Sequence, residues 1–208
     1  SMLTSSPAAS SQPATNRATA PSPAAPGSST GLIESMRTSS DASSTRVGSA
    51  GMDVLEIAPG LWRWSTYFGE WRHEVGSVYL ETEDAIVLID PLVPEDAGQE
   101  ERFWRALDRD VERSGAQVHV LVTVFWHTRS AARMVERYDA TVHAVSGARA
   151  AIETRAGRVD HVFRGLSELP CGVVAYPTVR RNEVVFWIPA HQAIVPGDVI
   201  LGSDEGGV

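Results

Sequence analysis

Alternating and continuous apolar runs predict four strands in the first part of the ordered chain. We predict strands at 53–58, 61–64, 75–82 and 85–90. A Pro59-Gly60 pair predicts the turn between the first two strands. The run Ala85–Asp90 is apolar without a break until its final residue, which is typical of a strand buried on both faces.

Farther along, helical and extended patterns alternate. Phe103, Trp104, Leu107 and Val111 recur at helical spacing, and Gly115 follows as an expected C-terminal cap. Helices are predicted over 96–114, 130–138 and 147–154, and strands over 118–123, 141–145, 172–176, 183–188, 194–195 and 199–201. Hairpin strands followed by strands that alternate with helices predict a layered α/β domain.

Composition separates an N-terminal arm from this domain. Ser, Ala, Thr, Pro and Gly make up 37 of the first 50 residues, and none of the 50 is aromatic. Such a segment buries too little apolar surface to offset its ordering entropy. We therefore predict a disordered arm over 1–51 and one domain over 52–208.

Charge and residue usage exclude several function classes. All 18 basic residues are Arg, so a Schiff-base enzyme, a Ser–Lys dyad and a lysine-containing phosphate loop are excluded. The net charge of −8 disfavours nucleic acid and anionic membranes as partners. The single cysteine, Cys171, rules out an intrachain disulfide and a Cys-rich zinc site, and it fits a cytoplasmic protein.

The order of several short motifs resembles the start and middle of the metallo-β-lactamase superfamily. These motifs are Ile57-Ala-Pro-Gly-Leu-Trp-Arg-Trp64, Gly76-Ser-Val-Tyr-Leu80, Ile86-Val-Leu-Ile-Asp-Pro91, the strand Val118–Thr123, and the segment 188–201 with its Pro-Gly-Asp turn. The resemblance implies an αββα sandwich with zinc or iron at one sheet edge. Relative to that fold, we expect the chain to be shortened at its C-terminal side.

Most of the metal ligands that the resemblance implies are replaced in this sequence. The family places His-x-His-x-Asp-His directly after a strand-ending Thr, and the matching stretch here is Thr123-Val-Phe-Trp-His-Thr-Arg-Ser130. In register, Val124, Trp126, Thr128 and Arg129 stand at the ligand positions. None of these four side chains is a useful zinc ligand.

Two metal-ligating residue types remain near the expected site. His127 lies one residue out of register, and Asp198 stands where a ligand belongs. The next expected histidine falls near Val179, where no ligand is present. Because catalytic zinc needs about three protein ligands, we expect no resident cofactor. A zinc or iron site that uses His127, Asp198 and a third group is the alternative. Asp90 is expected to support the structure.

The leading hypothesis is a non-catalytic or weakly catalytic protein that binds a small anionic ligand at this edge. Its candidate ligand-binding residues are Trp126, His127, Arg129 and His73. Arg129 carries a permanent positive charge where the family binds metal, and guanidinium groups favour anions. His73 lies in an expected loop, 71–74, that overhangs the site.

Two alternatives come from other function classes. One is a metal-dependent hydrolase of an ester, thioester or lactam that uses His127 and Asp198. The other is a protein-interaction module. An exposed sheet edge would favour a homodimer in either case.

Overall fold

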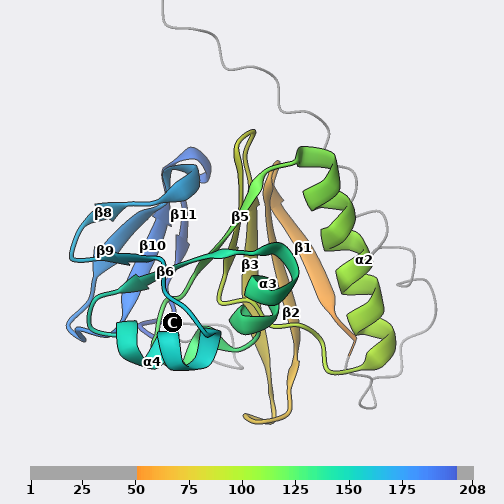
Figure 1. Cartoon of the computed structure of the whole chain (residues 1–208), viewed down its shortest axis with the longest axis horizontal. Coiled ribbons are helices and arrows are strands. Elements are labelled where there is room, and N and C mark those ends of the chain that lie inside the picture. Colours follow the sequence, from red (N-terminus) through yellow and green to blue (C-terminus); the bar gives the residue numbers. More distant parts are fainter. Residues whose placement is uncertain (1–50, 201–208) are drawn as a thin grey trace, which may run out of the picture.

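The computed structural model describes residues 51–200, which form two β-sheets and three α-helices (Figure 1). The strands of the larger sheet are β1 (Asp53–Ala58), β2 (Leu61–Phe68), β3 (His73–Glu81), β4 (Ala85–Ile89), β5 (Gln117–Leu121), β6 (Thr141–Val145) and β7 (His161–Phe163), in that spatial order. The smaller sheet has the order β11 (Ala193–Val195), β10 (Val184–Ile188), β9 (Val174–Pro177), β8 (Ser167–Glu168). The predicted arm, apart from Gly51, lies outside the described residues.

Helices connect the parallel strands of the larger sheet. Strands β1 to β4 pair antiparallel, and β4 to β7 pair parallel. The crossovers are α2 (Ala97–Ser114), α3 (Ala131–Tyr138) and α4 (Arg149–Ala156), and short 3-10 helices lie at η1 (Phe125–Thr128), η2 (Pro170–Gly172) and η3 (Pro189–His191). Because parallel neighbours need such crossovers, the loops that follow β4, β5 and β6 all emerge at one edge of the sheet.

Local signals in the sequence set the ends of α2. The Asp96 side chain accepts a hydrogen bond from the Gln99 amide at 3.0 Å, which satisfies one free donor of the first turn. Gly115 ends the helix at φ 63°, and its amide donates to the Val111 carbonyl, as in a left-handed C-cap. The buried face of the helix includes Phe103 and Leu107.

One core fills the space between the two sheets. Phe186 and Ile188 of β10 are fully buried, as are Ile89 and Leu121 of the larger sheet. Phe163 of β7 contacts Phe186, with ring centroids 6.4 Å apart. The layered α/β prediction is therefore confirmed. In the part of the chain that the structure describes, no helix is both long and apolar enough to cross a membrane.

The structure differs from the predicted elements at three places. Strands β2 and β3 pair as far as Phe68 opposite His73, so the loop predicted over 71–74 is a turn followed by strand. The short strands β7 and β8 have no counterpart in the prediction. The strand predicted over 199–201 is wrong for 199–200, because the Val199 amide donates to the Pro196 carbonyl and the chain turns there; Leu201 lies outside the described range.

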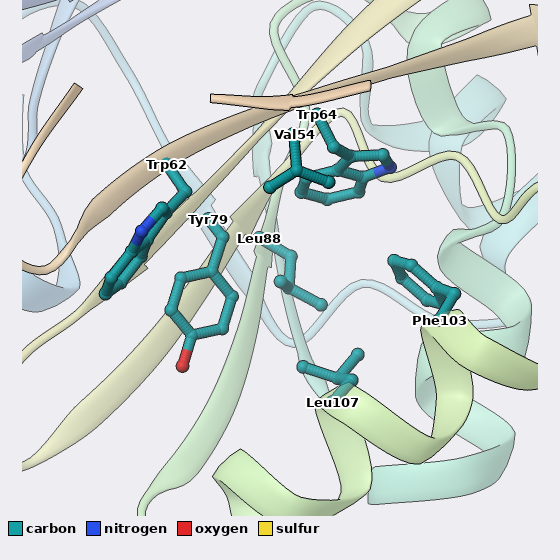
Figure 2. A pocket seen from close by; sticks show the side chains of 7 residues that line it. All are labelled: Val54, Trp62, Trp64, Tyr79, Leu88, Phe103 and Leu107. Atoms are coloured by element: carbon teal, nitrogen blue, oxygen red, sulfur yellow. The ribbon is translucent and has the colours of Figure 1, made fainter. Parts of the chain in front are cut away.

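An apolar cavity beneath α2 offers a test of core packing. Figure 2 shows Leu107 of α2 and Leu88 of β4 on its wall, and its volume is about 10 Å³. Replacing Leu107 with Ala would enlarge this space, so we expect a loss of about 2–5 kcal/mol in the free energy of unfolding. Leu107→Met keeps the volume and should cost less than about 1.5 kcal/mol. Urea denaturation of both variants checks this, and equal losses in the two would contradict it.

Candidate functional site

The carboxylate of Asp90 organises a polar cluster where β4 and β5 end. Asp90 is 5% exposed and has a φ of 51°. Its amide donates to the Leu121 carbonyl at 3.0 Å. The Oδ1 atom accepts from the Thr123 amide at 2.8 Å, and Oδ2 accepts from the Thr123 hydroxyl at 2.5 Å. Charged groups buried this deeply are retained only when they are hydrogen-bonded, so this aspartate ties two parallel strands together.

His127 lies between two carboxylates. It is buried in η1, with Nδ1 2.9 Å from Asp90 Oδ2 and Nε2 3.1 Å from Asp198 Oδ1. The contact between Nε2 and Asp198 is close enough for an ion pair, but it is not a hydrogen bond. Protonated His127 would therefore carry a positive charge between Asp90 and Asp198.

The loop after β11 brings Asp198 to this histidine. Gly197 has a φ of 61°, and a Cβ atom there would come within 2.9 Å of the Thr123 Cβ. Only glycine permits this approach at that backbone conformation. The Trp126 indole donates a hydrogen bond of 2.7 Å to Asp198 Oδ2. Trp126 thus holds one oxygen of Asp198 by a hydrogen bond, and the other oxygen lies 3.1 Å from His127 Nε2.

Arg129 places a guanidinium group beside the same cluster. Its Nη1 donates to the Gly76 carbonyl at 2.9 Å and to the Asp90 carbonyl at 3.2 Å. The guanidinium lies over the Trp71 ring, 5.1 Å from its centroid, in a cation–π contact. Burial lowers the pKa of Arg129, and the charges of Asp90 and Asp198 oppose that change. Its backbone φ of 39° is strained for a residue other than glycine.

A cleft opens beside these residues, and we call it the arginine cleft. Its volume is about 550 Å³. Its wall contains Phe68, Trp71, Trp126, Arg129, Arg133 and Arg155, together with Glu70, Glu95 and Glu100. Arg133 is paired with Glu100, and Arg155 lies over the Phe125 ring at 5.1 Å. Trp71 also contacts His127, with ring centroids 5.5 Å apart, and so connects the cleft to the buried cluster.

The structure brings together most of the sequence-predicted residues. Trp126, His127, Arg129 and Asp198 meet at one edge. His73 does not join them, because its pairing opposite Phe68 places it at the exposed start of β3, and it is not among the residues that line the cleft. Asp90, expected to be only supportive, contacts His127 directly.

Few metal-ligating side chains lie at this edge. Val124 is fully buried and bridges to Glu183 instead of facing a ligand. Asp198 is held by Trp126 and His127. Within residues 51–200, no group of three or more His, Cys, Asp or Glu side chains is arranged to hold a metal. Three protein ligands are the usual minimum for catalytic zinc.

Three histidines that no sequence spacing connects form a row across β5, β6 and β7. His119 Nδ1 lies 3.1 Å from His143 Nε2, and the His161 ring stacks on that of His143 at 4.9 Å. Parallel register places His143 opposite Leu121 and His161. Burial, with the nearby His119 and His161, lowers the pKa of His143 to about 4. Burial also lowers the pKa of His119.

Comparison with known proteins identifies the fold. No protein-family model and no curated protein sequence matches the chain. Among solved structures, metallo-β-lactamase IND-7 superposes with a TM-score of 0.51 at 18% identity, over 69% of this chain and 69% of its own. A metallo-β-lactamase from Pontibacter korlensis gives 0.51 at 18% identity, over 67% of each chain.

A third structure is larger than this chain. A flavoprotein from Thermotoga maritima gives a TM-score of 0.52 at 14% identity, over 77% of this chain and 46% of its own. The chain therefore spans less than half of that flavoprotein. Together these structures show that residues 51–200 have the metallo-β-lactamase fold, as the sequence motifs indicated.

The histidine row predicts a dependence of stability on pH. The pKa of His143 in the folded protein, about 4, lies below its ordinary value of 6.5. Between these values the unfolded chain binds a proton that the folded protein does not. The free energy of unfolding should therefore fall as the pH falls from 6.5 to 4, by up to about 1.4 kcal/mol per pH unit.

His143→Leu should flatten this pH dependence in urea denaturation measured at several pH values. The remaining slope would come from His119, whose pKa is also lowered. Val142→Ala, in the same strand, should lower stability without changing the slope. An unchanged slope in His143→Leu would show that His143 titrates alike in the folded and unfolded chains.

Proposed function

We propose that this metallo-β-lactamase-fold protein binds a small anionic ligand in the arginine cleft and does not catalyse a metal-dependent reaction. The observation that carries the proposal is the hydrogen bond of 2.7 Å from the Trp126 indole to Asp198 Oδ2. The indole N–H of Trp126 thus binds the carboxylate of Asp198, which the resemblance assigns to the metal. The residue that stands for the last ligand, Arg129, adds a positive charge to the wall of the cleft.

The guanidinium groups of the cleft, rather than its net charge, support an anion. Three Arg and three Glu side chains line the cleft. Glu100 is paired with Arg133, Glu95 accepts a hydrogen bond from the Gly69 amide, and Glu70 is the third carboxylate. Arg129 and Arg155 supply guanidinium groups whose planar forks suit carboxylate and phosphate oxygens. The cavity volume of about 550 Å³ falls in the range of small-molecule sites.

The metal-dependent hydrolase is the weaker candidate. His127 and Asp198 do lie together, as that hypothesis requires. Within residues 51–200, no third His, Cys, Asp or Glu side chain is placed to complete a metal site. The indole N–H of Trp126 offers no lone pair to a metal. The same residues therefore favour binding over metal catalysis.

Metal content distinguishes the two candidates. We expect the purified full chain, after dialysis against buffer without chelator, to contain far less than one equivalent of zinc or iron by elemental mass spectrometry. Stoichiometric zinc or iron retained through dialysis would overturn the non-metal proposal. An ester or lactam hydrolysis that disappears in Asp198→Ala would overturn it as well.

Anion binding is tested through the tryptophans of the cleft. Titration with inorganic phosphate should change the fluorescence of Trp71 and Trp126, which line the cleft. Arg155→Gln removes one charged donor from an exposed position, so the dissociation constant should rise by about tenfold. Arg105→Gln, an exposed position outside both clefts, is the matched control and should bind phosphate like the parent. Equal affinity in Arg155→Gln and the parent would contradict the proposal.

A further inference from the structure

A second cleft lies beside the histidine row, and we call it the histidine cleft. It is lined by His143, Arg149, His161, Phe163, Arg164 and Leu169, among others, and its volume is about 780 Å³. It shares no lining residue with the arginine cleft. We propose that the histidine cleft binds a phosphate monoester with an apolar body, independently of the arginine cleft.

His143 contributes a histidine ring to the lining of the cleft. His143 is only 5% exposed. Its Nε2 is 3.1 Å from His119 Nδ1, and no other residue of the described range hydrogen-bonds to the ring. Neutral imidazole keeps one donor and one acceptor. With Nε2 directed to His119, Nδ1 can bond to a ligand group in the cleft.

The mouth of the cleft is basic. Arg149 and Arg164 are exposed, and His161 lies beside them. Arg149 also forms an ion pair with Glu153, but only at 3.7 Å and between two exposed side chains, so it is weakly held. Glu168 is the acidic residue among those that line the cleft. Two guanidinium groups against one carboxylate favour an anionic head group.

The remaining wall is apolar, which selects an ester over a free anion. Phe163, Leu169 and Pro170 line this part, and Val162 is 42% exposed. Burying apolar surface there would stabilise a ligand by about 25 cal/mol per Å². An inorganic anion gains nothing from these residues, whereas the organic body of an ester covers them.

The histidine row does not suit a metal instead. The His161 and His143 rings stack face to face, with an interplanar angle of 27°. No metal-capable group of side chains is found across residues 51–200, so an anionic ligand fits the row better than a cation does.

The proposal is tested by titrating the full-length protein with phenyl phosphate and following histidine ring nitrogens by NMR. We expect the His143 and His161 signals to shift and to saturate. Inorganic phosphate should bind this cleft about tenfold more weakly, because it lacks the apolar body. The double variant Arg149→Gln/Arg164→Gln should raise the dissociation constant of phenyl phosphate by at least about tenfold. Both replaced side chains are exposed, so the fold should persist, which circular dichroism checks.

Arg105→Gln, an exposed position outside both clefts, is the matched control and should leave the phenyl phosphate affinity unchanged. Equal affinity in the double variant and the parent would overturn the proposal. So would equal affinity for phenyl phosphate and inorganic phosphate. Shifts confined to the indoles of Trp71 and Trp126 would place the ligand in the arginine cleft and also overturn it, while leaving the proposed function intact.

Discussion

The buried carboxylate of Asp90 is the contact on which the candidate site depends. It accepts both polar hydrogens of Thr123 and lies 2.9 Å from His127 Nδ1. A buried charge is tolerated only when hydrogen bonds and opposite charge replace its hydration. Thr123 donates two of these hydrogen bonds, His127 Nδ1 lies next to the same carboxylate, and His127 Nε2 in turn lies 3.1 Å from Asp198. One desolvated group thus fixes where β5 ends, how η1 turns and where the β11 loop docks.

Two of the six non-glycine residues with positive φ in residues 51–200 belong to this cluster. Asp90 and Arg129 both have positive φ, at 51° and 39°. Such conformations cost about 1–3 kcal/mol each and persist where surrounding contacts over-determine them. The Asp90 backbone carbonyl accepts from both the Ser77 hydroxyl and Arg129, so each strained residue helps to hold the other. Such strain is often found at binding sites. Here the strained residue Arg129 lines the arginine cleft.

Sequence periodicity was sufficient for the elements that depend on local signals. The apolar run of β4 and the capped, amphipathic α2 could both be predicted, because burial and capping leave a pattern in adjacent residues. The contact between Trp126 and Asp198 spans 72 positions and leaves no such pattern. The histidine row depends on strand register, which spacing along one chain does not encode. The loop predicted around His73 was wrong because nothing local showed that β2 and β3 continue to pair.

The lysine-free composition acquires a physical meaning at the two clefts. A buried ammonium group loses its proton readily, whereas guanidinium stays charged and keeps several directed donors. Arg129 can therefore remain a cation where burial lowers its pKa.

Helix α4 begins at Arg149 and ends shortly after Arg155, so one helix contributes a guanidinium group to each cleft. The backbone positions of these two arginines lie about 9 Å apart along the helix axis. Because the Debye length is about 8 Å at physiological salt, charges at this spacing interact mainly at low ionic strength.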